Sequence, residues 1–288
     1  MTSAKDPIRF GLIGVDSPHA VSFTRLFGDG IHGAVSGGTI AAAWQDDVDA
    51  AFPPSLRGPD HAAALMKAGV ELLGSPEELA DAVDAVLIVA ADARRHASLF
   101  ERVAATGKPI YVDTRFATTR GDAEHMLAQA DRSGSLVLAG SPKRFTEEFR
   151  AARACVRVVE HARITGALPV QPGLPGLQWY GVHLVDLAVA AFGPGLQDVS
   201  ASGGRYRLRW NDGRLAAIGG PVEWGPETRG DLRGDDGAQA SFRIIAEERM
   251  LTGLLHALVD AIRTDVPIVP VDEILDIVTA VERGSRLG

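Results

Sequence analysis

The stretch Asp84–Thr119, DAVLIVAADARRHASLFERVAATGKPIYVDTRFATT, decides the fold that the sequence predicts. Val86–Ala90 is a short apolar run with β-branched residues, which is typical of a buried strand. Ala97–Thr106 has apolar residues at helical spacing and is followed by a glycine, and Pro109–Val112 indicates a second buried strand. Strand, helix and strand form a βαβ unit, so we expect two parallel neighbours in a sheet that is covered on both faces.

Polar residues follow both strands of this unit. Asp92 comes directly after the first strand, and His96 ends the same loop. Asp113, Thr114 and Arg115 follow the second strand. Because ligands of parallel sheets bind at the carboxyl ends of the strands, we expect ligand-binding residues among these side chains.

The same stretch resembles the Gfo/Idh/MocA oxidoreductases, two-domain nicotinamide-dependent dehydrogenases of sugars, inositols and related polyols. These proteins have a strand-end loop that ends in a histidine, then a helix, then a strand that leads to Glu-Lys-Pro. Here the loop ends in His96, and the Glu-Lys-Pro position is Asp113-Thr114-Arg115. The order of loop, helix and strand matches the family, but the family's catalytic lysine is absent. The resemblance covers essentially the whole chain at the level of the fold.

The composition argues against several classes of protein. The 288 residues suit two domains, and 46% of them are hydrophobic, enough for a sizeable core. The net charge of −8 argues against nonspecific nucleic-acid binding. The single cysteine, Cys155, excludes an intrachain disulfide and indicates a reducing, cytoplasmic location. No apolar run approaches the roughly 18 residues of a membrane span, and we see no secretory signal.

The first predicted strand, Ile8–Val15, leads into the loop where a Rossmann fold keeps its G-x-G-x-x-G motif. Aligned on Gly14, the second and third glycine positions hold Asp16 and His19, and Ser17 is a good N-cap for the following helix. A carboxylate at the second position repels a pyrophosphate unless a cation or a turned-away rotamer relieves it. Three interpretations stay open: Asp16 caps the turn, dinucleotide binding is impaired or absent, or Asp16 or His19 takes an active role.

The next predicted strand, Thr39–Trp44, is where the family carries an acidic residue for the adenosine ribose. Asp46 is the nearest acidic candidate, and it equally suits a solvated turn. No arginine lies at this strand end, so NADP gains no specific support, and the sequence as a whole does not decide between NAD and NADP. The resemblance implies one of them as the cofactor, held by the residues around Gly14 together with Asp46, Asp92, His96 and Thr114.

The composition shifts near Phe145. We predict a Rossmann-like α/β domain with a parallel sheet over residues 1–145 and an α+β domain with an open antiparallel sheet over residues 146–288. Strands are indicated at 157–166, 199–201, 206–211, 215–219 and 238–245, and helices at 178–192, 247–263 and 271–286. An exposed apolar face on the second sheet would predict a homodimer or homotetramer built sheet to sheet, an expectation from the family.

A lysine and a histidine share the proton transfer in the family, the histidine coming from an Asp-x-x-x-His helix. In this chain His183 matches that histidine, Trp179 occupies the acidic position, and Asp186 lies one turn further on. His183 is either a general acid/base or a core histidine satisfied by Asp186. In both cases we expect Asp186 to orient the ring.

Lys143, just past the last Rossmann strand, is the candidate stand-in for the missing lysine, or else forms a solvated pair or an anion clamp with Arg144. Arg115 stays protonated, so it suits a carboxylate or phosphate of the substrate rather than the role of base. Asp113 and Asp92 offer a carboxylate pair for acid/base chemistry, or simply cap turns. The histidines lack metal-ligand spacing, so we predict no metal site.

Three functions remain possible from the sequence. The first is an NAD(P)-dependent oxidoreductase of a small, polar, sugar- or polyol-like substrate. The second is a non-redox member of the family that kept the fold, such as a binding or regulatory protein or a partner subunit. The third is a cofactor-independent lyase or isomerase that uses His183. Fold alone cannot choose among them.

Overall fold

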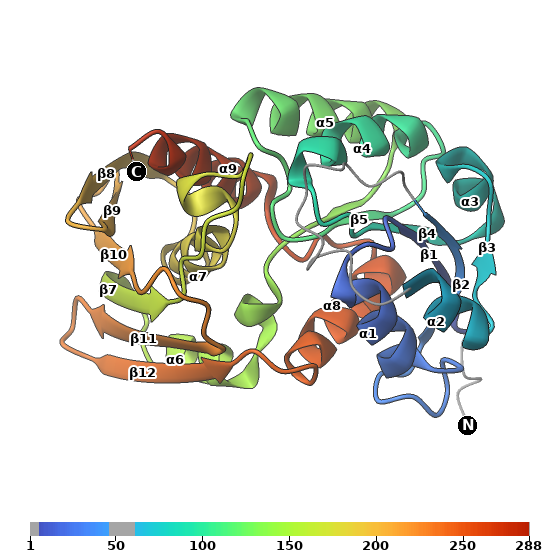
Figure 1. The fold of residues 1–288 in the computed structure, drawn as a ribbon. Coiled ribbons are helices and arrows are strands. Elements are labelled where there is room, and N and C mark those ends of the chain that lie inside the picture. Colours follow the sequence, from blue (N-terminus) through green and yellow to red (C-terminus); the bar gives the residue numbers. More distant parts are fainter. Residues whose placement is uncertain (1–5, 46–60, 288) are drawn as a thin grey trace. The chain divides into compact units, whose positions relative to one another are not determined.

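A computed structural model describes residues 6–45 and 61–287, and the chain divides into two units (Figure 1). The units interleave along the sequence. The first comprises residues 1–113, 124–139 and 255–268, and the second comprises residues 114–123, 140–254 and 269–288. The single domain boundary near residue 145 stays a prediction from sequence.

The first unit is built on sheet A, six parallel strands in the order β3-β2-β1-β4-β5-β6. The strands are β1 (Ile8–Ile13), β2 (Gly38–Trp44), β3 (Glu71–Leu72), β4 (Ala85–Ile88), β5 (Ile110–Val112) and β6 (Val137–Leu138). This is the doubly wound order, in which the chain changes direction between β1 and β4. The predicted Rossmann sheet is confirmed.

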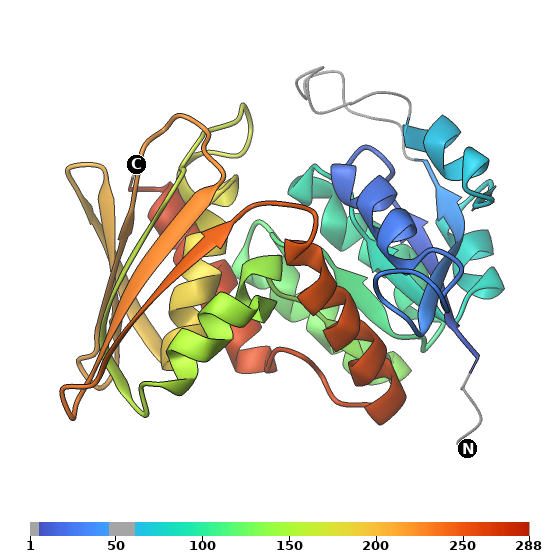
Figure 2. The same cartoon turned by 90° about the horizontal axis from the view of Figure 1, so that it is seen from below.

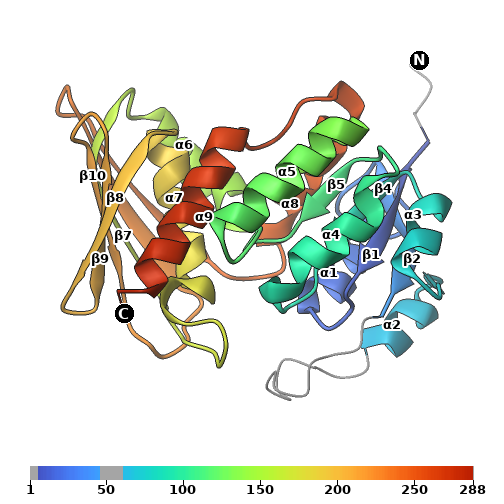
Figure 3. The ribbon, with the colours of Figure 1, turned by 90° about the horizontal axis from the view of Figure 1, so that it is seen from above.

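Helices cover both faces of sheet A (Figures 1 and 3). They are α1 (Pro18–Phe27), α2 (His61–Lys67), α3 (Pro76–Ala82), α4 (His96–Ala104), and parts of α5 (Arg120–Ser133) and α8 (Met250–Thr264). Figure 1 shows α3, α4 and α5 on one face and α1, α2 and α8 on the other. Every residue of β4 is buried, which is why these strands appear in the sequence as unbroken apolar runs.

The second unit is built on sheet B, six strands in the order β12-β11-β7-β10-β9-β8. The strands are β7 (Val159–Gly166), β8 (Leu196–Ser202), β9 (Arg205–Trp210), β10 (Leu215–Gly219), β11 (Glu227–Gly234) and β12 (Gln239–Ile245). The sheet is mixed rather than antiparallel, because β7 and β10 are parallel. The chain between them contains a helix and two strands, long enough for the crossover that a parallel pair needs.

One face of sheet B is covered and the other carries no helix of the described residues (Figure 2). The covering helices are α6 (Glu147–Ala154), α7 (Gly181–Phe192) and α9 (Val271–Ser285). Apolar side chains from these helices and from the inner face of the sheet make one core, with Trp210 stacked on Phe192 at 4.3 Å between ring centroids. The outer face is formed by the alternate, exposed residues of each strand.

β11 is absent from the sequence prediction. Its inward positions are Thr228, Gly230, Leu232 and Gly234, so only one large apolar residue marks the strand. Gly230 is required there because an added Cβ would lie 2.2 Å from the Phe242 ring of the neighbouring strand. Among the described residues, no helix is both long and apolar enough to cross a lipid bilayer.

Candidate functional site

The carboxyl edge of sheet A begins at Gly14, directly after β1. Gly14 has a φ of +87°, and a Cβ added to it would lie 2.5 Å from the Ala90 Cα at the end of β4. Its N–H donates to the Trp44 carbonyl at 3.1 Å. Only glycine tolerates both the left-handed conformation and this close approach, so Gly14 has the geometry of the first glycine in a dinucleotide loop.

Asp16 and Ser17, at the next turn, accept hydrogen bonds from different backbone N–H groups. The Asp16 carboxylate accepts from the Ala91 N–H, with oxygen–nitrogen distances of 3.2 and 3.3 Å, so it is held at the end of β4. Ser17 Oγ accepts from the His19 N–H at 3.3 Å and caps α1, and Pro18 is the first helical residue. The predicted Ser17 cap is confirmed, and Ser17 rather than Asp16 caps the helix.

His19, at the third glycine position, is bound to the end of β5. Its Nδ1 lies 2.7 Å from Asp113 Oδ2, and the Tyr111 hydroxyl donates to the other oxygen of Asp113 at 2.9 Å. Asp113 is 2% exposed and His19 side chain 25% exposed, and the His19 ring stacks on Phe23. An ionised carboxylate only accepts, so Nδ1 is the donor and Asp113 orients the imidazole.

Asp92 and His96 are occupied by their own loop. Asp92 accepts from the Arg94 N–H at 3.0 Å, pairs with the Arg94 guanidinium and caps the short 3₁₀ turn that precedes α4. His96 is fully buried, and its Nε2 lies 2.8 Å from the Ala90 carbonyl, so Nε2 carries the proton. Both side chains support the loop, and their part in cofactor binding stays a prediction. Thr114 is 5% exposed, and Asp46 lies outside the described residues.

The second unit gathers the other predicted residues around Ser141. Ser141 Oγ lies 2.8 Å from Nδ1 of His183, which is partly exposed near the start of α7. The Ser141 N–H donates to Asp186 Oδ2 at 3.1 Å. We expected Asp186 to orient the His183 ring, and the structure links the two through Ser141, a residue that sequence reasoning missed.

Asp186 is itself held by a buried ion pair. Arg144 Nε lies 2.9 Å from Asp186 Oδ1, and an Arg144 terminal nitrogen donates to Glu273 at 2.8 Å. Asp186 is 2% exposed, and this burial raises its pKa while the Arg144 guanidinium opposes that shift. Lys143 and Arg144 are not a solvated pair, because both side chains are buried.

Lys143 is the most unusual cation of the second unit. It is 6% exposed, and its Nζ donates to Thr228 Oγ1 on β11 at 2.8 Å. Its backbone N–H donates to Ser141 Oγ at 3.3 Å. Burial lowers the pKa of Lys143 to about 8, which makes it a base that is usable near neutral pH.

Arg115 stands on a strained backbone, with a φ of +76°. Its guanidinium lies 4.6 Å from the centroid of the Trp179 ring and donates to the Trp179 carbonyl at 3.3 Å. The aromatic row continues from Trp179 to Tyr180 and His183, and Trp224 Nε1 donates to the Tyr180 hydroxyl at 3.2 Å. Anion binding by Arg115 stays a prediction.

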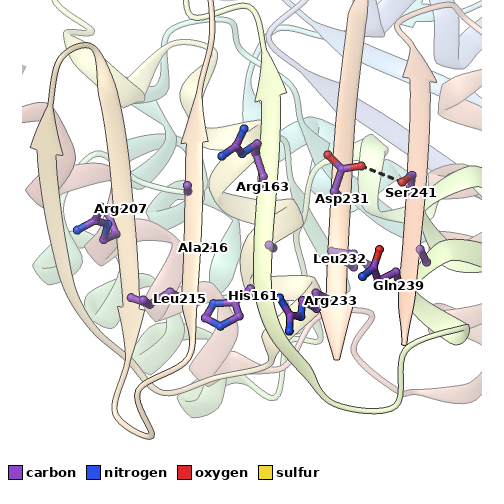
Figure 4. A pocket seen from close by; sticks show the side chains of 13 residues that line it. His161, Arg163, Arg207, Leu215, Ala216, Asp231, Leu232, Arg233, Gln239 and Ser241 are labelled. Atoms are coloured by element: carbon purple, nitrogen blue, oxygen red, sulfur yellow. Dashed lines mark hydrogen bonds between the residues drawn. The ribbon is translucent and has the colours of Figure 1, made fainter. Parts of the chain in front are cut away.

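The outer face of sheet B is charged rather than apolar. A groove of about 460 Å³ lies across β9, β10, β7, β11 and β12, and Figure 4 shows His161, Arg163, Arg207 and Arg233 along it. Within the described residues, no group of three or more His, Cys, Asp or Glu side chains is arranged to hold a metal ion. We expected sheet-to-sheet assembly if this outer face was exposed and apolar. The structure shows arginines on it instead.

No protein-family model and no curated protein matches this sequence. Solved structures share its fold over nearly the whole chain. GenD2 from gentamicin A biosynthesis, in complex with NAD, has a TM-score of 0.77 at 15% identity and covers 99% of this chain and 95% of its own. A putative myo-inositol dehydrogenase from Sinorhizobium meliloti has a TM-score of 0.77 at 18% identity, with 97% of each chain covered.

A third structure of this fold is the myo-inositol dehydrogenase from Lactobacillus casei in complex with NAD(H) and myo-inositol. Its TM-score is 0.75 at 13% identity, and it covers 98% of this chain and 94% of its own. The fold is therefore that of sugar- and polyol-type dehydrogenases, as the Gfo/Idh/MocA resemblance implied. At these identities the likeness establishes the fold alone.

Proposed function

We propose that the protein is an NAD(P)-dependent oxidoreductase of a small polar substrate of the sugar or polyol type. The observation that carries this proposal is the carboxyl edge of sheet A, where Gly14 makes the tight turn and Asp16 is anchored at the end of β4. The Asp16 carboxylate, which would repel a pyrophosphate at this position, thereby accepts a hydrogen bond from the Ala91 N–H. Neighbours of the same fold are crystallised with NAD, which supports the same cofactor here.

The residues of this edge fit a dinucleotide, but their hydrogen-bond donors differ from those of a glycine loop. Pro18 has no N–H and the His19 N–H is capped by Ser17, so α1 offers fewer backbone donors than a glycine loop does. We assign the replacement to the Ser17 hydroxyl and the His19 imidazole, which Asp113 orients. When bound, the nicotinamide supplies the acceptor for a hydride from the substrate.

The proton chemistry belongs to His183 and Lys143. Ser141 Oγ lies 2.8 Å from Nδ1 of His183, and we assign the ring proton to Nδ1, so that Nε2 is the basic nitrogen that takes the proton of the substrate hydroxyl. Lys143 takes the place of the family lysine, because burial brings its pKa to about 8. Asp186 is a positioning residue, since it fixes the Ser141 backbone.

The test is cofactor binding, followed through the fluorescence of NADH and NADPH. We expect micromolar affinity for the wild-type protein and a loss of about tenfold in His19→Ala, which is the loss of one hydrogen bond to a charged group. His125→Ala, an exposed histidine on α5, is the matched control and should bind like the wild type. A His183→Ala variant then serves as the control in a substrate screen.

Absence of binding at about 1 mM cofactor, equivalent to about −4 kcal/mol or weaker, would remove the dehydrogenase proposal. The buried Lys143 and the partly exposed His183 would then remain for a cofactor-independent lyase or isomerase, or the fold would serve a binding or regulatory role. If His19→Ala binds the cofactor as tightly as the wild type, cofactor binding stands and the assignment of His19 is refuted.

We also propose a homodimer or homotetramer through the outer face of sheet B, in a reducing, cytoplasmic setting that the single cysteine favours. Two copies that meet through this face bring arginines together, so screening of their repulsion should strengthen the association. Sedimentation at about 20 mM and about 500 mM salt tests this point. A monomer at both salt concentrations would contradict the assembly.

A further inference from the structure

The strand register arranges the outer face of sheet B in rows. In one row, Arg207 of β9 lies opposite Ala217 of β10, which lies opposite Arg163 of β7, which lies opposite Asp231 of β11. In the next row, His161 of β7 lies opposite Arg233 of β11. Because neighbouring strands are about 4.8 Å apart, Arg163 and Arg207 start about 10 Å from each other, one on each side of β10.

A groove forms because two of the three outward residues of the middle strand are small. The outward residues of β10 are Leu215, Ala217 and Gly219, whereas the strands beside it present Arg207 and Arg163. The resulting groove has a volume of about 460 Å³, within the range of small-molecule sites. Figure 4 shows arginine side chains on both sides of β10 along this groove.

The arginines of the groove have no acidic partners among residues 6–45 and 61–287. Arg229 and Arg243, on the same face, both pair with Glu227, but Arg163, Arg207 and Arg233 form no ion pair. Asp231 lies opposite Arg163, yet its carboxylate accepts from the Ser241 hydroxyl at 2.8 Å. These three guanidinium groups are available to an external anion.

The face as a whole is positive on an acidic protein. Seven arginines point outward from sheet B against four carboxylates, a surplus of three positive charges on a chain whose net charge is −8. The arginines are 163, 205, 207, 209, 229, 233 and 243, and the carboxylates are 160, 198, 227 and 231. A second copy that meets this face, as proposed above, adds to this surplus, and a multivalent anion in the groove cancels it in the monomer and in the assembly alike.

We propose that this groove binds a small polyanion that carries at least two phosphate or carboxylate groups. Guanidinium groups match both oxyanions in a planar, two-pronged geometry. A ligand with two such groups lets Arg163 and Arg207, which start about 10 Å apart on opposite sides of β10, each bind a separate oxyanion. Arg233, diagonal to Arg163 across about 7–8 Å, adds a third contact to the same ligand.

Isothermal titration of the full-length protein with inorganic pyrophosphate, and separately with citrate, tests the proposal. At about 20 mM salt we expect a Kd of about 10–100 µM for at least one of them, and weaker binding at high salt. Binding of pyrophosphate alone identifies a phosphate ligand, and binding of citrate alone a carboxylate ligand. Arg163→Gln combined with Arg207→Gln should weaken binding at least about tenfold.

Two controls separate this groove from other basic surfaces. Arg132→Gln changes the same charge at an exposed position on α5 and should bind like the wild type. His19→Ala should also retain the binding, which excludes the edge of sheet A as the site. The proposal is overturned if neither anion binds at millimolar concentration, if the double variant binds as tightly as the wild type, or if His19→Ala loses the binding. A stable dimer that binds neither anion would equally overturn it.

Discussion

Replacing Lys143 by methionine should stabilise the protein at neutral pH while it removes activity. The unfolded chain holds the Lys143 proton with the ordinary pKa of 10.5, and the folded chain with a pKa of about 8. One pKa unit corresponds to about 1.4 kcal/mol, so the buried charge destabilises the folded state by about 3 kcal/mol at pH 7. Methionine fills a similar volume without the charge.

The hydrogen bond from Lys143 to Thr228 offsets part of this gain. Its loss costs about 1 kcal/mol, which leaves a net stabilisation of about 2 kcal/mol for Lys143→Met at pH 7. Between pH 8 and 10.5 the folded state has lost the proton and the unfolded state still holds it, so the wild type gains stability as the pH rises. The two proteins should be about equally stable near pH 10.

Urea unfolding of the wild type and Lys143→Met at pH 7 and at about pH 10 measures this difference. Lys67→Met, at an exposed position on α2, is the control and should show no such dependence on pH. A Lys143→Met protein that is less stable than the wild type at pH 7 would refute the reasoning. So would a stability difference that stays the same at both pH values.

Three further substitutions test the frame of the two sites. Gly14→Ala should lose about 3 kcal/mol or more in urea unfolding, because its Cβ would lie 2.5 Å from the backbone at the end of β4 and its φ is positive; a loss below about 1 kcal/mol would contradict this. Asp186→Ala should lose about 1–3 kcal/mol in the same assay, because Arg144 keeps only Glu273 as a partner and the buried Ser141 N–H loses its acceptor, and near-neutrality would contradict the ion pair. Ser141→Ala should lower kcat/KM about tenfold and alter the pH profile assigned to His183, with cofactor affinity unchanged; an unaltered profile would make Ser141 merely structural.

The fold of the first unit was predictable because buried parallel strands need apolar residues on both faces. The runs around Val86 and Ile110 and the Ser17-Pro18 helix start carry that requirement in the sequence itself. β11 escaped prediction because Gly230 and Gly234 occupy inward positions where a strand normally shows large apolar residues. Gly230 is needed because the Phe242 ring packs against it in the folded sheet, and the local sequence pattern does not reveal that contact.

The candidate site was predictable in its residues and not in its connections. His183 was found from its helix motif, but Ser141, which lies 42 positions earlier, binds its ring. Asp113 was expected as an acid or base, and the structure shows it bound by His19 from 94 positions away. The burial of Lys143, which lowers its pKa, likewise depends on β11. Such contacts arise from the tertiary fold and cannot be predicted from the spacing of residues along the sequence.

The absorbance of reduced nicotinamide gives the most direct measurement of the central claim. The purified protein is mixed with NAD or NADP and a panel of inositols, sugars and sugar acids, and the formation of NADH or NADPH is followed over time. We predict turnover with at least one polyol and a loss of about a hundredfold or more in His183→Ala. No turnover with any of them, in a protein that also fails to bind the cofactor, would contradict the account.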